Sequence, residues 1–541
     1  MKYHCIEPYY LSTYEQQPKT SMTNNRKLPI GIQDFEGLRT ENFLYVDKTA
    51  YIYKLAQEGR PYFLGRPRRF GKSLLLSTIK YYFQGRKDLF EGLAIADLET
   101  DWVEYPVFYL DFNVGLYSDK KSLENALDTN LRTIEEQWGR DMEDVDVTAR
   151  FASVIRRACE KSGKKVVVLV DEYDKPLLGT MDNLNENDDV RKVLKAFYGV
   201  LKSSDQYLRF AFLTGVTKFS KVSIFSDLNQ LRDISMTEDY AAICGICERE
   251  LIGNFEPEIQ ALAEKNNLTV EATLVKLKQR YDGYHFAAQS DGMYNPFSVL
   301  NVFASREFRD YWFATGTPTF LVQAVKRAEL DICKFDNDFT FPARSIDDYR
   351  AETNNPTSIL YQSGYLTIKG YDSRVDEYTL GFPNGEVKYG FLNELLPAYL
   401  PHPEQSMDFY AGRFVKDLLA DNVESFMVRL RALFADIPYE LNNKNEKHYQ
   451  TLLYLIFKLM GQFVQVEYRT AIGRIDVVVV VNEVVYVFEL KITENGTAED
   501  ALRQINEKGY ALPFSADGHK VVKVGVEFSA QERMPARWVI E

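Results

Sequence analysis

Long hydrophobic runs are missing from this chain of 541 residues. No segment approaches the roughly 18 uninterrupted apolar residues that a membrane-spanning helix requires, so we expect no membrane partner. The first residues, 1–27, are polar and lack the basic stretch followed by an apolar stretch that marks a secretory signal. We therefore expect these residues to form a flexible extension before the first folded domain.

Cysteine is also scarce, with five residues in the whole chain. An odd number of cysteines without a secretory signal indicates a reducing environment, and we expect a cytoplasmic protein. Cys244 and Cys247 form a single CxxC pair without a second pair or nearby histidines, which makes the pair a weak metal signal. We expect two small residues on a helix instead.

Repeats and low-complexity segments are missing too, and the composition is that of a folded protein. With 45% hydrophobic and 14% aromatic residues, the chain is long enough to build several domains with packed cores. The formal net charge of −13 argues against a protein that coats nucleic acid over its whole surface. It leaves room for a local basic groove.

A phosphate-binding pattern is present in the segment RPYFLGRPRRFGKSLLLSTIK. Its short apolar run, Tyr62–Leu64, suits a buried strand, and apolar residues after Ser73 recur at helical spacing. Gly71 and Lys72 lie between the two. At the start of a helix, backbone N–H groups bind phosphate, the lysine adds a positive charge and the serine hydroxyl binds Mg²⁺. The usual spacing of such a loop requires its first glycine at the position of Arg66, and the nearest glycine is one residue too early.

Three further apolar runs predict strands that alternate with helices. Alternation of this kind indicates a doubly wound parallel sheet, so we expect an α/β P-loop NTPase fold. The central run of valines is continuous, as in a strand that is buried on both faces. The expected strands are Pro106–Phe112, Val166–Val170 and Tyr207–Gly215, and the expected helices cover residues 121–138, 147–161 and 188–203.

Acidic residues follow the valine run, at the edge where ligands of open α/β sheets bind. We expect Asp171 to hold Mg²⁺ and Glu172 to orient or polarise the attacking water. Thr214, near the end of the next strand, is expected to sense the γ-phosphate. The alternative is that Asp171 and Glu172 only cap a helix.

The segments FLGRPRRFGKSLL, VVLVDEYDKPL, LTGVTKFSKVSIFSDLNQLRDIS and YDGYHF…NPFSVLN resemble the AAA-ATPase-like family found in bacteria, whose members typically carry a nuclease-like tail. The resemblance runs from about Leu28 to the early 300s. It implies that Arg66 is normal for this loop, and that Arg68 and Arg69 contact phosphate oxygens. The alternative for the two arginines is a solvated basic turn. The candidate nucleotide-binding residues are Gly65, Arg68, Arg69, Gly71, Lys72, Ser73, Leu74 and Thr214.

The middle of the chain is predicted to be connective and helical, with helical spacing through residues 238–280 and 297–330. Ser358–Leu400 then reads as a helix, a strand, a turn, a strand and a helix, the order of a winged-helix unit. Such a unit either binds DNA or packs against an ATPase core. Its first strand and turn hold only Lys369 and Arg374 against several acids, so we favour packing.

Charged residues interrupt the valine-rich segment GRIDVVVVVNEVVYVFELK near the C-terminus. Two strands joined by a turn centred on residues 482–483 have one register, in which Asp476 lies opposite Glu489 and Arg474 opposite Lys491. A three-residue loop would shift every pairing by one residue. The expected strands are Ile475–Val481 and Val484–Leu490, with Val487, Phe488 and Leu490 packed around Val477 and Val479.

Two carboxylates opposite each other on neighbouring strands repel unless a cation or a proton lies between them. A Mg²⁺ ion bound by Asp476 and Glu489 would remove this penalty, and Lys491 would hold or deprotonate an attacking water. These groups together suit the hydrolysis of a phosphodiester.

An aspartate, a hairpin and then Glu-x-Lys resemble the PD-(D/E)xK nuclease superfamily, as do the flanking segments NKNEKHYQTLLYLIFKLMG and EDALRQINEKGYALPF. The resemblance covers about Asn443 to Glu541. Two alternatives stay open: Glu446 also fits a helix cap with Asn443, and Lys491 also fits a residue that blunts an edge strand. The resemblance implies the metal ligands Glu446, Asp476 and Glu489, the catalytic Lys491 and the auxiliary Gln504.

The sequence therefore predicts four parts: an extension (1–27), a P-loop domain (28–300), a helical and winged-helix-like middle (301–408) and a nuclease-like domain (409–541). The last boundary is expected near residues 401–409, which contain two prolines and no periodicity. The favoured function is an ATP- and Mg²⁺-dependent ATPase coupled to a Mg²⁺-dependent nuclease acting on nucleic acid, with DNA favoured. Homo-oligomer formation is left open. The alternatives are a nucleotide-dependent switch with an inert nuclease-like tail, and an NTPase that acts on protein partners.

Overall fold

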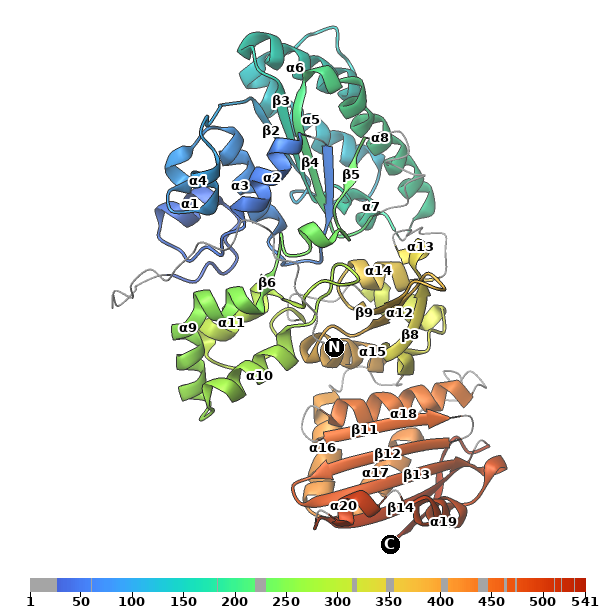
Figure 1. The fold of residues 1–541 in the computed structure, drawn as a ribbon. Helices are drawn as coiled ribbons and strands as arrows, with labels where there is room; N and C mark the ends of the chain where they lie inside the picture. Colours follow the sequence, from blue (N-terminus) through green and yellow to red (C-terminus); the bar gives the residue numbers. More distant parts are fainter. Residues whose placement is uncertain are drawn as a thin grey trace.

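The computed structural model describes most of the chain from residue 27 onward, as three successive parts with the middle part between two sheet domains (Figure 1). The expected extension up to residue 26 lies outside the described residues. The described ranges are 27–59, 61–181, 183–218, 230–313, 319–346, 355–399, 407–435, 446–461, 465–471, 474–509, 511–516, 518–529 and 531–541.

The N-terminal part contains a sheet of parallel strands with helices around it. Its strands are β1 (Pro61–Gly65), β2 (Val107–Asp111), β3 (Val166–Asp171), β4 (Leu208–Gly215) and β5 (Arg232–Asp233), in the order β2-β3-β4-β1-β5. Its helices are α1 (Phe35–Thr40), α2 (Thr49–Glu58), α3 (Lys72–Phe83), α4 (Ala94–Leu98), α5 (Lys120–Trp138), α6 (Val147–Ser162), α7 (Lys175–Gly179) and α8 (Leu184–Ser203). α3 packs on β2, β3 and β4, whereas α5, α6 and α8 pack on one another and form a separate layer (Figure 1). The predicted doubly wound parallel sheet is confirmed.

The central strand β3 is buried along its whole length, and every residue of Val166–Val170 is 0% exposed. Helices cover both faces of an all-parallel sheet, which is why this strand needs no polar face. Because all strands are parallel, the loops that follow β1, β3 and β4 meet at one edge. β4 lies between β1 and β3, so the phosphate loop and the acids approach each other across one strand.

Three helices after the sheet build a small hydrophobic core of their own, which Leu44 joins. They are α9 (Glu248–Lys265), α10 (Val270–Tyr281) and α11 (Pro296–Ser305). The helical prediction is therefore wrong for residues 238–247, and also for residues 306–312, which follow the end of α11. Cys244 and Cys247 do not lie on a helix, because Cys247 pairs with Met293 in the short sheet of β6 (Ile246–Cys247) and β7 (Met293–Tyr294) and keeps the backbone extended until α9 begins.

A winged-helix-like unit follows in the predicted order: α14 (Thr357–Gln362), β9 (Thr367–Asp372), β10 (Glu377–Gly381) and α15 (Gly385–Leu395). The preceding elements are α12 (Thr319–Arg327), β8 (Asp336–Pro342) and α13 (Ala343–Ile346), and β8 completes an antiparallel sheet β8-β10-β9. The Lys218 N–H donates to Gln362 Oε1 at 2.8 Å, and the His285 N–H donates to Thr367 Oγ1 at 2.7 Å. These bonds confirm that the unit packs against the preceding parts.

The C-terminal part is a second α/β domain with a mixed sheet, in the order β11-β12-β13-β14-β15. The helices α16 and α18 pack together, and α19 packs on β13 and β14. The predicted boundary at 401–409 falls largely outside the described residues, which resume at 407. The elements are α16 (Met407–Leu419), α17 (Val423–Ala435), α18 (Glu446–Met460), β11 (Gln465–Ala471), β12 (Arg474–Val481), β13 (Val484–Ile492), α19 (Ala498–Lys508), α20 (Leu512–Ala516), β14 (Lys520–Ser529) and β15 (Met534–Ile540).

The valine-rich hairpin has the predicted register. Asp476 pairs with Glu489, and Arg474 pairs with Lys491. The strands close on a two-residue turn, in which Asn482 takes a φ of 54°, a left-handed conformation that asparagine tolerates.

The packing predicted for Val487 is wrong. Phe488 joins the large core with Val477, whereas Val487 lies in a separate cluster with Ile505 of α19. Side chains alternate along a strand, so Val487 shares the face of Glu489 and not that of Phe488.

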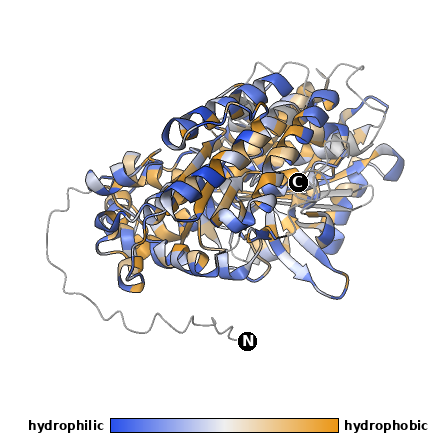
Figure 2. Ribbon diagram, turned by 90° about the horizontal axis from the view of Figure 1, so that it is seen from above, coloured by the Kyte–Doolittle hydropathy of each residue, from blue (hydrophilic) through white to orange (hydrophobic). Residues whose placement is uncertain are grey.

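Hydrophobic residues gather toward the interior of the molecule, and hydrophilic residues lie on the outer turns of its helices (Figure 2). Within the part of the chain that the structure describes, no helix is long and apolar enough to cross a membrane.

Candidate nucleotide and nuclease sites

The phosphate loop runs from the end of β1 into α3. Gly71 precedes the helix with a φ of 91°, which side-chain-bearing residues rarely adopt, although the space beside it is open. The backbone conformation, and not crowding, therefore requires glycine here. The first N–H groups of a helix have no partner within the helix, so those of Lys72, Ser73 and Leu74 are available to an anion.

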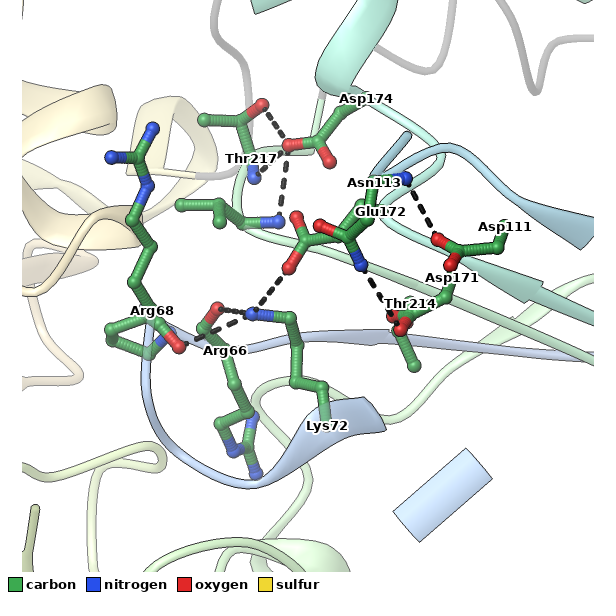
Figure 3. Close-up of polar contacts among 12 residues, drawn as sticks. Arg66, Arg68, Lys72, Asp111, Asn113, Asp171, Glu172, Asp174, Thr214 and Thr217 are labelled. Carbon is green, nitrogen blue, oxygen red and sulfur yellow. Dashed lines mark hydrogen bonds and ion pairs between the residues drawn. The ribbon is translucent and has the colours of Figure 1, made fainter. Parts of the chain in front are cut away.

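The Lys72 ammonium lies at the centre of this loop and is 4% exposed (Figure 3). It donates to the carbonyl oxygens of Arg66 at 3.1 Å and Pro67 at 3.3 Å, and lies 3.3 Å from Glu172 Oε1. A phosphate group that enters the loop offers the same ammonium stronger, charged acceptors. Glu172 has a φ of 51°, so the chain turns sharply directly after β3.

Asp171 is buried at the end of β3, and its carboxylate is held from two sides. The Ser73 side chain lies beside it, and Thr214 Oγ1 donates to Oδ1 at 2.7 Å. Burial raises the pKa of Asp171, the negative charge of Glu172 adds to this, and the hydrogen bonds oppose it. A bound cation would remove the cost of the buried charge, so the pair of Ser73 and Asp171 fits the two expected Mg²⁺ ligands. Thr214 is itself 0% exposed and lies behind Asp171, which it orients.

The two arginines of the loop are exposed, and both line the cavity at the phosphate loop. The Arg68 side chain extends away from Lys72 (Figure 3). Its carbonyl oxygen accepts a hydrogen bond from Trp312 Nε1 at 3.1 Å, and the Arg69 guanidinium lies 4.8 Å from the centre of the Phe297 ring.

Gly65 does not lie among the cavity-lining residues of the described chain. Its N–H donates to Ser235 Oγ at 2.7 Å, so this group is not free for a phosphate. Arg66, which takes the glycine position, is 1% exposed and also turned away from the cavity. Its guanidinium donates to backbone carbonyls beneath the loop.

Sequence reasoning missed several polar residues of this site. Asn113, just after β2, donates from Nδ2 toward Asp171 Oδ2 at 3.5 Å. Asp174 is buried, and its Oδ2 accepts from the N–H groups of Val216 and Thr217 and from the Thr217 hydroxyl. Burial, with the charge of Glu172, raises the pKa of Asp174 to about 6. Asn113 follows the strand next to β3, so the rule that ligands gather at strand ends was a usable signal for it.

A cavity of about 710 Å³ opens over the loop. Lys72, Ser73 and Glu172 line its polar part, and Ile32, Leu44, Phe255, Phe297 and Leu300 are among its apolar lining residues. Ligand pockets of about 300–1,000 Å³ that combine apolar walls with a few polar groups hold molecules of nucleotide size.

The candidate nuclease site lies on the face of the C-terminal sheet that α19 covers. Glu489 is 0% exposed, and its Oε1 accepts a hydrogen bond from Gln504 Nε2 of α19. Gln504 therefore contacts the expected site, although its position in the sequence alone gave no evidence for this contact. Lys491 is half-buried, and its stem lies against Gly496 just before α19.

Close approach of α19 depends on a glycine beside Glu489. Gly525 of β14 pairs with Glu489, and a Cβ atom at this position would lie 2.2 Å from the Ala498 carbonyl oxygen and 2.7 Å from the Leu502 nitrogen. Any larger residue would push α19, and with it Gln504, away from the sheet.

The other two expected acids are placed only by their backbones. Asp476 lies opposite Glu489, and Glu446 is the first residue of α18. The side chains of both lie outside the described part of the structure. Among the described residues, no group of three or more His, Cys, Asp or Glu side chains is gathered as a metal site.

Comparison with known proteins matches a region in each of the two sheet domains. Residues 29–225 match the family described as Predicted AAA-ATPase, and residues 444–538 match the PD-(D/E)XK nuclease superfamily. The chain is also similar to the "Uncharacterized protein in vnfD 5'region" of Azotobacter chroococcum mcd 1, with 38% identity over 532 residues that cover 96% of this chain and 99% of that protein. The similarity to this relative therefore spans both matched regions of the chain.

Proposed function

The chain belongs to the family of predicted AAA-ATPases that carry a C-terminal PD-(D/E)XK nuclease superfamily domain, and from this premise we propose that it hydrolyses ATP and cleaves nucleic acid, with DNA as the favoured substrate. The observation that carries the proposal is the convergence of Lys72, Asp171 and Glu172 at one edge of the sheet. The pairing of Asp476 with Glu489 supports the nuclease part.

In the ATPase reaction, the N–H groups at the start of α3 bind the phosphate oxygens, and Lys72 exchanges its carbonyl partners for them. Glu172, released from Lys72, orients the attacking water. The Ser73 hydroxyl and Asp171 would hold Mg²⁺, which would neutralise phosphate charge when bound. Arg68 and Arg69 contribute positive charge at the rim of the cavity.

In the nuclease reaction, Asp476 and Glu489 would hold Mg²⁺, with Glu446 as a further ligand, and the ion would supply Lewis-acid chemistry at the phosphodiester when bound. Gln504 fixes the orientation of the Glu489 carboxylate through its hydrogen bond. Lys491 holds the attacking water or accepts its proton.

The proposal is tested with the full chain and its Lys72→Ala and Asp476→Ala variants. We expect Lys72→Ala to lose ATP hydrolysis, and Asp476→Ala to lose cleavage of plasmid and single-stranded DNA in Mg²⁺ while it keeps ATP hydrolysis. Glu483→Ala, an exposed acid in the turn of the same hairpin, is the matched control and is expected to cut normally. Normal cleavage by Asp476→Ala would remove the nuclease assignment.

A second function, a nucleotide-dependent switch with an inert nuclease-like tail, is favoured by one observation. Glu489 is fully buried beneath α19, so a substrate reaches it only if α19 moves or the metal lies at the Asp476 side. This alternative predicts nucleotide-dependent assembly without strand cleavage in Mg²⁺ or Mn²⁺.

A further inference from the structure

A buried carboxylate joins three segments beneath the phosphate loop. Glu386, in the first turn of α15, is 0% exposed. It accepts hydrogen bonds from the Ser298 hydroxyl of α11 at 2.6 Å and from the N–H groups of Tyr311 at 2.5 Å and Trp312 at 2.7 Å. A buried carboxylate persists when several donors satisfy it, and removal of one donor costs more than an exposed bond would.

The same segment contacts the phosphate loop directly. Trp312 Nε1 donates to the carbonyl oxygen of Arg68, three residues before Gly71. One residue before Gly71, Phe70 packs edge-on against Tyr284 with 4.8 Å between ring centres. Tyr284 belongs to the YDGYHF segment, for which the proposed reactions give no role. The loop therefore rests on a support built from residues 284–312 and the start of α15.

The next turns of α15 contact the nuclease-like domain (Figure 1). Tyr389 OH donates to the Gly461 carbonyl oxygen, just after α18, at 3.0 Å. Lys388 Nζ and Lys458 Nζ of α18 each lie 2.6 Å from a different carboxylate oxygen of Asp336. Tyr454 of α18 also donates to Asp336 at 3.1 Å. Asp336 thus links α15 to the helix that begins at Glu446.

We infer that Glu386 and Trp312 are positioning residues for the phosphate loop, and that α15 transmits the state of this loop to α18 of the nuclease-like domain. The inference rests on the proposed binding of a nucleoside triphosphate at the loop. Tyr389 lies three positions after Glu386, so one rigid helix turn connects the two sets of contacts.

The physical basis is a change at the loop that a phosphate requires. Lys72 donates to the carbonyl oxygens of Arg66 and Pro67, and it must release them to bind the nucleotide. The next peptide group, between Arg68 and Arg69, carries the Arg68 carbonyl oxygen, which accepts the hydrogen bond from Trp312. Rotation of this peptide group therefore moves Trp312, together with the backbone N–H groups of Tyr311 and Trp312 that donate to Glu386. Packed elements respond to such shifts as units, because their interiors do not deform continuously.

The experiment measures amide hydrogen exchange of the full chain with and without a non-hydrolysable ATP analogue and Mg²⁺. We expect the analogue to change exchange in the peptides that cover residues 385–395 and 446–461. Trp312→Phe, which keeps a ring but loses the indole donor, is expected to weaken analogue binding about fivefold, the equivalent of one neutral hydrogen bond. Trp102→Phe is its control. The Trp102 indole also donates to a backbone carbonyl oxygen, that of Glu99, but it does so away from the cavity.

The link to α18 is tested with Tyr389→Phe, which removes only the hydroxyl. We expect it to bind the analogue as the wild type does but to lose the nucleotide-dependent change in residues 446–461. Its control, Tyr371→Phe, loses a surface bond to Asp376 in the same unit and is expected to keep that change. A merely structural role of Tyr389 would raise exchange equally with and without the analogue, and would overturn the inference.

The outcomes separate this inference from the proposed function. Binding of the analogue without any change in residues 446–461 of the wild type overturns the link and leaves the nucleotide site intact. Absence of binding overturns both. Neither result depends on cleavage, so an inactive nuclease does not affect the test.

Discussion

Arg66 is a buried cation whose partners are backbone carbonyls. Its guanidinium donates to Ser235 at 2.7 Å and Tyr240 at 3.0 Å, and stacks 4.0 Å from the centre of the Phe286 ring. An arginine fork presents five N–H donors in a fixed planar geometry, whereas a lysine ammonium has three donors on one compact group. Arg66 therefore supports the loop from beneath. Arg68 and Arg69, two and three positions later, line the cavity.

This division of roles predicts different outcomes for the same substitution at two neighbouring arginines. Arg66→Lys leaves buried carbonyls without donors, so we expect a lower thermal unfolding midpoint together with weaker ATP binding. Arg68→Lys changes an exposed residue, and we expect weaker ATP binding at an unchanged midpoint. Calorimetry and nucleotide titration of both variants check this, and an unchanged midpoint of Arg66→Lys would contradict it.

Glu386 predicts a pH dependence at the residue scale. Burial raises its pKa from the usual 4.5 to about 7, against the three bonds donated to it. The folded protein then holds a proton that the unfolded chain releases between about pH 4.5 and 7. The stability contributed by this group is full below pH 4.5 and is lost as the pH rises through 7, by up to about 3 kcal/mol.

Glu386→Gln removes this titration. We expect the unfolding midpoint of the wild type, measured relative to that of Glu386→Gln, to decrease as the pH is raised from 5 to 7. Parallel curves for the two proteins over this range would show that Glu386 does not titrate there.

At the scale of elements, the hairpin and α19 together make the candidate nuclease site. The sheet places Asp476 and Glu489 opposite each other, but only α19 brings Gln504 to Glu489. This contact depends on the close approach of α19 to Gly525, where no side chain fits.

Gly525→Ala is therefore expected to displace α19. Its Cβ would overlap backbone atoms, which cannot rotate away as a side chain can, so we expect a loss of several kcal/mol of stability and of DNA cleavage. Gly412→Ala is the control, since nothing lies within 4 Å of a Cβ there and alanine favours the helix α16. Unfolding curves and cleavage assays of the two variants give the comparison, and normal cleavage by Gly525→Ala would contradict the role of α19.

At the scale of the whole molecule, the middle part contacts both sheet domains, through Gln362 of α14 on one side and Tyr389 of α15 on the other. If the nucleotide binds only the folded N-terminal part, MgATP at a hundred times its dissociation constant stabilises that part by about 2.7 kcal/mol. We expect a corresponding rise of the first unfolding midpoint in the wild type and in Lys164→Ala, an exposed lysine before β3. Lys72→Ala is expected to show no rise, and an equal rise would place the nucleotide elsewhere.

Local patterns were enough to predict the strands of the N-terminal parallel sheet up to β4 and the hairpin pairing. Strand and helix periods depend on neighbours in sequence, and a two-residue turn leaves only one register, so Asp476 opposite Glu489 followed from spacing alone. The same alternation places Val487 on the face of Glu489, so the wrong packing predicted for Val487 was avoidable from the sequence. The helical prediction around Cys244 failed for another reason, because Cys247 pairs with Met293, which is far away in the sequence.

The sequence by itself thus determined the α/β class, the phosphate loop, the acids at the end of β3 and the register of β12 with β13. Only the tertiary structure decided that Arg66 is buried under the loop and that Gln504 reaches Glu489. The same holds for the contacts of α15, where Glu386 binds Trp312 and Tyr389 binds Gly461. The reason is physical: the former depend on residues close in the chain, whereas the latter depend on burial and hydrogen bonds between segments that only folding brings together.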